Sequence, residues 1–218
     1  MLDFNNKKTP LVLALDIGTT KVCALAGMRN EFGKIEITGI GKVKSEGVSR
    51  GVVSNIDKTV KAIKEAVNIA EINSGKKFDS VFVGIAGQHI KSLQHHGLLV
   101  RKDTNSEIDQ NDISRLIDDM YKLVLPPGDK ILHVIPQEYI VDNEENITDP
   151  IGMSGVRLEA NFHIITGQVT ASKNIFKVVE KADLKVNDLM NNIASATAVL
   201  NDEKEAGVAL IDIGGGTY

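Results

Sequence analysis

The tripeptide Asp-Ile-Gly occurs twice in this chain, each time at the end of a run of apolar residues. The first copy, Asp16-Ile17-Gly18-Thr19-Thr20, follows the run that begins at Leu11, and the second, Asp212-Ile213-Gly214-Gly215-Gly216-Thr217, follows the run that begins at Val208. A short apolar run that ends at aspartate and glycine predicts a buried strand followed by a tight turn. Two such units predict two similar half-domains, each with one loop of the same kind.

The residue types in these loops suit the phosphates of a nucleotide. Glycine lets the backbone turn so that successive N–H groups point at an anion. A carboxylate at the end of the strand can hold Mg²⁺ through water. One Asp-x-Gly is a common sequence, but the duplicated pair, with hydroxyls behind both glycine groups and Lys21 behind the first, favours ATP.

The first 85 residues follow the order of three strands, a helix and a strand. The three strands are predicted at Leu11 to Asp16, Val22 to Gly27 and Ile35 to Ile40, separated by short turns as in an antiparallel meander. Ser54 or Asn55 can cap the helix, which Gly75 ends. The next strand is predicted at Val81 to Ile85.

The middle of the chain reads as a small α+β insertion. A strand is predicted at Leu98 to Arg101, and a helix follows whose apolar stripe includes Ile113, Leu116 and Met120. Two long strands come next, Lys130 to Asp142 and Arg157 to Thr166, and Pro136 in the first favours an edge strand or a bulge. Beyond the insertion we expect a helix around Ile175 to Ala182, a strand at Val186 to Met190, a short helix at Ala194 to Leu200, and the second phosphate strand at Val208 to Ile213.

The bulk properties exclude several classes. The chain has 218 residues and a formal net charge of -4, which disfavours nucleic-acid binding. Its single cysteine, Cys23, cannot form an intramolecular disulfide and is predicted to be a buried structural thiol. No signal peptide or membrane-length apolar run is present, so we expect a cytoplasmic chain whose membrane anchor, if it has one, lies elsewhere. The five histidines are predicted to be solvated or strand-face residues, not metal ligands.

The duplicated loops resemble those of the actin-like ATPase superfamily. The most specific phrases, Val83 to Ile90, Leu132 to Tyr139 and Asp149 to Leu158, closely resemble the FtsA family of bacterial cell-division proteins, as do Ser49 to Val53 and Ile193 to Ala196. The resemblance runs from about Leu11 to Thr217. It implies an α/β fold: an actin-like (ribonuclease H-like) half-domain with a small α+β inserted subdomain, called 1C.

This resemblance also implies a domain plan and a function. Residues 1–85 and 164–206 would form subdomain 1A, 86–163 the inserted 1C, and 207–218 the first strand and phosphate loop of subdomain 2A. Family members bind ATP, polymerise with other FtsA subunits, tether FtsZ to the inner membrane through a C-terminal helix, and recruit later division proteins. We therefore expect a protein on the cytoplasmic face of that membrane at the division site. The FtsZ site and the membrane helix are expected outside this chain.

The family's site residues carry over to matching positions. Those expected to bind phosphate are Gly18, Thr19, Thr20, Lys21, Gly214, Gly215, Gly216 and Thr217, and those expected to position Mg²⁺ through water are Asp16 and Asp212. Asn192, or a neighbour, stands where related ATPases have a glutamate or glutamine that orients the attacking water, so we expect at most slow ATP hydrolysis. ATP would be chiefly a conformational or polymerisation ligand.

Two further questions stay open at this point. The acidic residues of the insertion's helix, among them Asp112, Asp118 and Asp119, form either an ordinary solvated face or a docking surface for a basic partner tail. The alternatives to an FtsA-like function are a PilM-like type IV pilus assembly protein and a small-molecule kinase of the actin-like superfamily. A kinase would need a general-base carboxylate near its acceptor site, and a turnover screen with sugars and acetate separates these classes.

Overall fold

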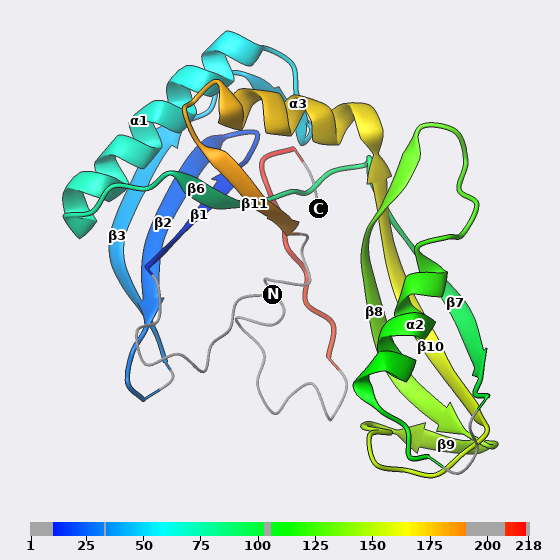
Figure 1. The fold of residues 1–218 in the computed structure, drawn as a ribbon. Coiled ribbons are helices and arrows are strands. Elements are labelled where there is room, and N and C mark those ends of the chain that lie inside the picture. The colour runs from blue at the N-terminus through cyan, green and yellow to red at the C-terminus, as the bar shows by residue number, and fades with distance from the viewer. Residues whose placement is uncertain (1–10, 33, 103–105, 191–207, 217–218) are drawn as a thin grey trace. The chain divides into compact units, whose positions relative to one another are not determined.

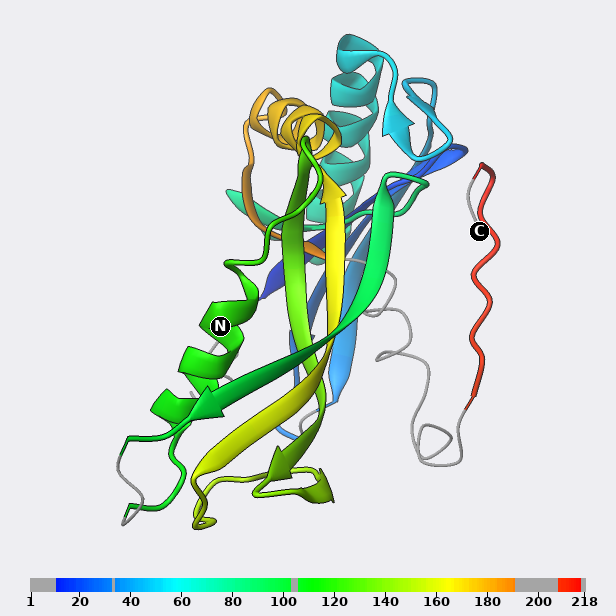
Figure 2. The ribbon, with the colours of Figure 1, turned by 90° about the vertical axis from the view of Figure 1, so that its right-hand side faces the viewer.

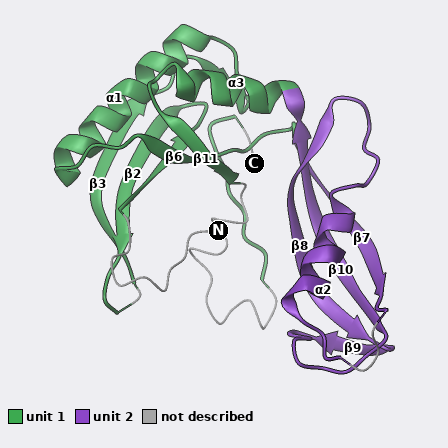
Figure 3. Ribbon diagram, in the orientation of Figure 1, with its two compact units in different colours: residues 1–89, 170–218 green, residues 90–169 purple. Residues whose placement is uncertain are grey.

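The computed structural model describes residues 11–32, 34–102, 106–190 and 208–216 of the chain (Figure 1). The chain divides into two compact units, Met1–His89 with Thr170–Tyr218, and Ile90–Val169 (Figure 3). The first unit holds a mixed sheet and the second an antiparallel sheet. The expected mixed α/β class with an inserted subdomain is confirmed.

The first unit is built on a five-stranded sheet in the order β11-β6-β1-β2-β3. β1 and β2 pair antiparallel, as do β2 and β3, whereas β6 runs parallel to both β1 and β11. Helices α1 and α3 lie on the same face of this sheet (Figure 1). The bounds are β1 Val12–Ile17, β2 Lys21–Arg29, β3 Ile35–Lys44, β4 Val48–Ser49, β5 Val52–Val53, α1 Ile56–Ser74, β6 Ser80–Gly84, α3 Val169–Glu180 and β11 Lys185–Met190.

Local sequence explains why these elements form. In β1, Leu13 and Leu15 are buried whereas the alternate residue Asp16 is exposed, as the period of a half-buried strand requires. Asn55 caps α1, because its side chain accepts the N–H of Lys58, and a left-handed Gly75 ends the helix. The strands and the helix predicted for this region are confirmed.

The second unit is a four-stranded antiparallel sheet in the order β7-β10-β8-β9 with helix α2 packed on it. Phe162 lies at the centre of its core and is fully buried, together with Leu116 of α2. A Cβ atom at Gly97 would lie 2.8 Å from Phe162 Cε2 and 3.2 Å from Leu116 Cδ1, so only glycine leaves the helix room there. The bounds are β7 Ile90–Val100, α2 Gln110–Met120, β8 Asp129–Val141, β9 Glu144–Ile147 and β10 Arg157–Gln168.

Two expectations for this unit are corrected. The strand predicted at 98–101 is the end of a longer strand that begins at Ile90 and pairs with β10 along its length. The segment 143–155, predicted to be a loop, contains β9. The irregularity expected at Pro136 is confirmed, because the register of β8 against β10 shifts there: Pro136 faces Phe162 while Glu138 faces Asn161.

The predicted strand at 208–213 is not formed. Residues 208–214 have no regular secondary structure, and Figure 2 shows them as an extended segment (red). Val208, Ile211 and Ile213 are 49%, 76% and 80% exposed. A strand needs a neighbour for its N–H and C=O groups, and no described strand pairs with this run. The short helix expected at 194–200, and Asn192, lie outside the described residues.

Candidate functional site

The first loop is a tight turn between β1 and β2. The Gly18 N–H donates to the carbonyl oxygen of Lys21 at 3.0 Å, and a Cβ atom at Gly18 would lie 2.9 Å from that same oxygen. The N–H of Ser45 donates to the carbonyl of Thr20 at 3.1 Å. Backbone hydrogen bonds therefore fix the loop at Gly18 and at Thr20, and position 18 requires glycine.

Asp16 stands at the end of β1, on the sheet face opposite the buried leucines. Its carboxylate reaches solvent, but the surrounding protein partly desolvates it, which raises its pKa above the usual value. The charge of Lys21 opposes this shift, and the negative charge of Asp212 adds to it. The two aspartates of the repeated tripeptide thus lie close enough to interact electrostatically.

The second loop lies against the first. A Cβ atom at Gly215 would overlap the side chain of Thr20, and one at Gly216 would lie 2.8 Å from the Thr19 hydroxyl oxygen. Asp212 and Gly214 are exposed, and Thr217 lies outside the described residues. Of the residues predicted from sequence, the structure therefore brings Asp16 near Asp212 and places Gly215 and Gly216 against Thr20 and Thr19.

This arrangement suits a magnesium nucleotide in its chemistry. It offers two carboxylates, two threonine hydroxyls, a lysine and the N–H groups of glycine-rich loops. Within the described residues no group of three or more histidine, cysteine or acidic side chains gathers around one point. A divalent cation here would therefore complete its shell with water and phosphate oxygens, which is how Mg²⁺ is commonly held.

Cys23 lies beside this site, opposite Asp16 in the β1–β2 pairing. It is half-buried, not fully buried as predicted from its apolar neighbours. Burial, and then the charge of Asp16, raise the pKa of the thiol above its usual value. The thiol is therefore protonated at neutral pH and a poor nucleophile.

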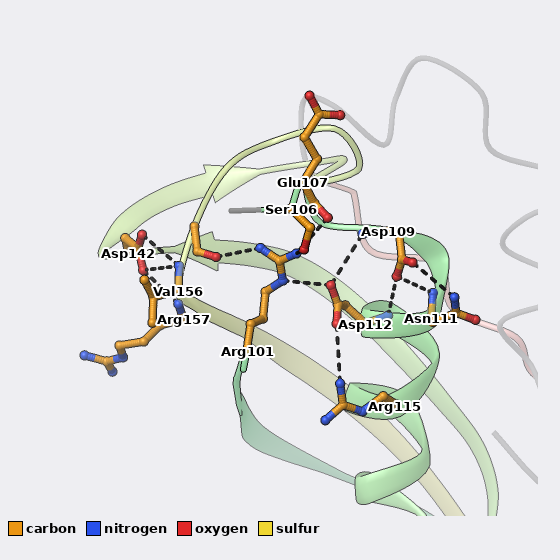
Figure 4. A network of polar contacts seen from close by, with 11 residues as sticks. Arg101, Ser106, Glu107, Asp109, Asn111, Asp112, Arg115, Asp142, Val156 and Arg157 are labelled. Carbon is orange, nitrogen blue, oxygen red and sulfur yellow. Dashed lines mark hydrogen bonds and ion pairs between the residues drawn. The ribbon is translucent and has the colours of Figure 1, made fainter. Parts of the chain in front are cut away.

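The acidic residues of α2 have different environments. Asp112 is 9% exposed and forms an ion pair with Arg101, with 2.8 Å between Asp112 Oδ2 and Arg101 Nε (Figure 4). Asp118 is exposed, and Asp119 pairs with Lys122 at 2.6 Å. The expectation that all three could face a partner is corrected for Asp112, which belongs to the interior of the unit.

Arg101 is a structural centre that the sequence reasoning missed. Its guanidinium donates to Asp112, to the carbonyl oxygens of Gly155 and Glu107 at 2.7 Å each, and to the Ser106 hydroxyl at 3.0 Å (Figure 4). One side chain therefore joins the end of β7, the start of α2 and the loop before β10. The signal was present in the sequence, because Asp112 precedes Leu116 by four residues and so lies on the buried stripe of the helix.

Of two notable histidines, His89 differs from expectation, whereas His96, a half-exposed residue of β7, matches it. His89 is 5% exposed, outside any strand, and neither of its ring nitrogens has a hydrogen-bond partner. On the outer face of the second sheet, His96 Nε2 lies 2.8 Å from Glu159 Oε2 and its Nδ1 lies 3.0 Å from Asn161 Oδ1. The Asn161 amide nitrogen donates to Glu138, which fixes the amide so that its oxygen faces His96.

Both ring nitrogens of His96 therefore face acceptors, and only the doubly protonated imidazolium can donate to both. The hydrogen bonds to Asn161 and Glu159 raise the pKa of His96 above its usual value. Glu159 is 7% exposed and also pairs with Arg157 at 2.8 Å. The network is an ordinary means of satisfying a buried carboxylate.

Comparison with known proteins gives a consistent result. A family model described as the SHS2 domain inserted in FtsA matches residues 87–166. The cell division protein FtsA of Pseudomonas aeruginosa is 46% identical over 209 residues, 95% of this chain and 50% of that protein. FtsA of Neisseria meningitidis is 47% identical over 208 residues, 94% of this chain and 50% of that protein. A solved PilM-PilN type IV pilus biogenesis complex matches 88% of this chain and 50% of its own, with a TM-score of 0.58 at 10% identity.

The structural match, at such low identity, shows the fold alone. With the matched insertion, it defines the chain as a protein of actin-like fold that carries an inserted SHS2 domain. The chain spans about half the length of the curated relatives it matches. Within that span it is a homologue of the bacterial cell-division protein FtsA. Among the described residues, no helix has both the length and the apolar character to cross a membrane.

Proposed function

We propose that this chain carries the nucleotide-binding loops and the inserted docking domain of an ATP-binding cell-division protein. The observation that carries the proposal is the meeting of the two Asp-Ile-Gly loops: Asp212 acts on the charge state of Asp16, and Gly215 and Gly216 lie against Thr20 and Thr19. A nest of this kind, open to solvent and lined by carboxylates, suits the phosphates of Mg-ATP.

In the bound state, Mg²⁺ would neutralise phosphate charge, and the chain's own groups would position the ligand. Asp16 and Asp212 would hold the ion through water. The N–H groups of Gly214 to Gly216, with the hydroxyls of Thr19, Thr20 and Thr217, would bind the phosphate oxygens. Gly18, whose own N–H donates to the carbonyl of Lys21, would keep the first loop tight beside them, and Lys21 would add positive charge. ATP would act mainly as a conformational or polymerisation ligand, with slow hydrolysis at most.

The remaining functions follow from homology to FtsA. We assign residues 1–85 and 164–206 to subdomain 1A, 86–163 to the inserted 1C, and 207–218 to the start of 2A. The protein would polymerise with other subunits at the cytoplasmic face of the inner membrane, tether FtsZ, and recruit later division proteins through 1C. On 1C, the acidic residues that are open to a partner are Asp118 and Asp119.

The test is the binding of Mg-ATP by the full-length gene product, measured by titration calorimetry. Replacing Asp16 by alanine should lower the affinity by about 10- to 100-fold, the usual effect of removing an outer-shell metal partner. Asp118→Ala, at an exposed position, serves as a control with the same loss of charge. Unchanged affinity in Asp16→Ala, or no binding by the unmodified protein, would contradict the proposal.

The two alternatives receive no specific support. The PilM-PilN structure shares the fold at 10% identity, whereas the FtsA relatives are 46% and 47% identical. A kinase would phosphorylate a small molecule, so turnover of ATP with sugars or acetate would favour that class over an FtsA-like protein.

A further inference from the structure

A turn of two residues between β4 and β5 lies against the first loop. Arg50 and Gly51 have φ of 49° and 75°, and both values are left-handed, as a type I′ turn between paired strands requires. The Gly51 N–H donates to the Thr19 hydroxyl oxygen at 3.2 Å. Because the backbone is the donor, Thr19 accepts this bond and keeps its own proton for another acceptor. The turn therefore leaves the Thr19 hydroxyl as a donor.

The same turn also lies against the backbone that follows β6. A Cβ atom at Gly51 would overlap the carbonyl oxygen of Ala86 and lie 3.0 Å from Gly87 Cα. Gly87 has a φ of 147°, and a Cβ atom there would lie 2.8 Å from the His89 ring. No side chain separates the turn from this segment. The contact is between backbone atoms, at residues that are only partly buried, so no rotamer change can absorb a shift of the turn and the segment must follow it.

The segment from Ile85 to His89 leads directly into the second unit, which begins at Ile90. The Ile85 N–H donates to the carbonyl of Met190 at 2.7 Å, which fixes the start of the segment. At its end, His89 is 5% exposed with both ring nitrogens unpartnered. An unpaired buried polar group is costly, so the buried position of the His89 ring is unfavourable for that side chain. A small displacement of this end is therefore easier than one at its start.

We propose that the Arg50–Gly51 turn positions the Thr19 hydroxyl for phosphate and links it to the Ile85–His89 segment at the entrance to the inserted unit. The proposal rests on the proposed function, since the phosphate would belong to the nucleotide. A hydroxyl that donates to a phosphate becomes a better acceptor, because hydrogen bonds in a chain polarise one another. Phosphate at Thr19 thus strengthens the bond from Gly51, and the turn and the segment behind it become more rigid.

Hydrogen exchange of the full-length gene product tests this link. The protein is saturated with Mg²⁺ and a non-hydrolysable ATP analogue, so that a weaker affinity is not mistaken for a lost response. In the unmodified protein the nucleotide should slow exchange of amides in residues 48–53 and 85–90. In Gly51→Ala the response of residues 85–90 should disappear. Gly75→Ala is the matched control, because Gly75 has a φ of 66° but a Cβ atom there would meet nothing within 4 Å.

A second variant keeps the test decisive if Gly51→Ala does not fold. Thr19→Val retains the branched shape and removes the hydroxyl, and without nucleotide it should speed exchange at Gly51 and at residues 85–90 by about five- to tenfold, the effect of one lost hydrogen bond. Exchange at 85–90 that is unchanged by this substitution overturns the link. If the unmodified protein binds no ATP but Thr19→Val still alters residues 85–90, the proposed function fails and the link stands.

Discussion

Replacing Asp112 by alanine should strongly destabilise the second unit. Arg101, its partner, has a side chain that is 4% exposed, and the Asp112 side chain is 13% exposed. The substitution leaves the guanidinium buried with two carbonyls and one hydroxyl as partners but without a counter-charge. A buried cation that loses its anion pays a desolvation cost that nothing offsets.

The expected loss is about 3 to 5 kcal/mol, the range for removing one partner of a buried pair. Replacing both partners by apolar residues, as in Arg101→Met with Asp112→Leu, should not restore stability here, although it often does for simpler pairs. The carbonyl oxygens of Gly155 and Glu107 would lose their donor, at about 1 to 3 kcal/mol each. Asp118→Ala, at an exposed position of the same helix, should change stability by less than about 0.5 kcal/mol.

Native-state hydrogen exchange of amides in α2 and β10 is the appropriate assay, because it reports on this unit even when the two units unfold separately. If Asp112→Ala and Asp118→Ala agree within 1 kcal/mol, the reasoning about Arg101 is wrong. A fully stable double variant would instead show that the carbonyl contacts contribute little.

Two shorter predictions concern surface charge. The raised pKa of His96 means that its contribution to stability is fully present below pH 6.5 and is lost as the pH rises through the higher folded value. His96→Gln should remove that pH dependence of the unfolding free energy of the second unit, a change of at most about 1 kcal/mol because the site is half-exposed. A pH profile equal to that of the unmodified protein would refute this. Replacing both Asp118 and Asp119 by lysine should weaken binding of a fluorescent oligolysine peptide at low salt but not at high salt, with an unchanged melting temperature. Replacing Glu36 and Glu65, exposed acids of the first unit, by lysine controls for net charge. Equal peptide binding at low salt would show that Asp118 and Asp119 are an ordinary solvated face.

Sequence periodicity predicted the elements whose pattern is local. The alternation in β1 and the capped helix α1 are properties of consecutive residues, and both were found where expected. β9 was missed although its signal was present, because Asp142 and Asn143 both have positive φ, 47° and 76°, and residues of this type favour such turns. The early part of β7 gave no such signal. No strand was predicted for its polar residues, including His96, because they are stabilised by partners on β10 that are distant in sequence.

In the candidate site, too, features of consecutive residues could be predicted, whereas contacts between residues far apart in sequence could not. The repeated Asp-Ile-Gly phrase identified the loops, because glycine turns after strands are local features. The contact between Gly51 and Thr19 joins residues 32 positions apart. No pattern in either segment indicates that the other is near. Only the folded sheet, which sets the β4–β5 turn beside the β1–β2 loop, reveals it.

The run from Val208 to Ile213 shows why an apolar pattern alone does not make a strand. The pattern shows that a segment gains by burial, but burial in a sheet also requires neighbours that accept and donate its backbone hydrogen bonds. Here the run stays exposed while the glycines that follow it still lie against Thr19 and Thr20. The two loops are in direct contact, and the negative charges of Asp16 and Asp212 are near enough to repel each other. Under the proposed function, a divalent cation would hold the two loops together by relieving the repulsion between those carboxylates.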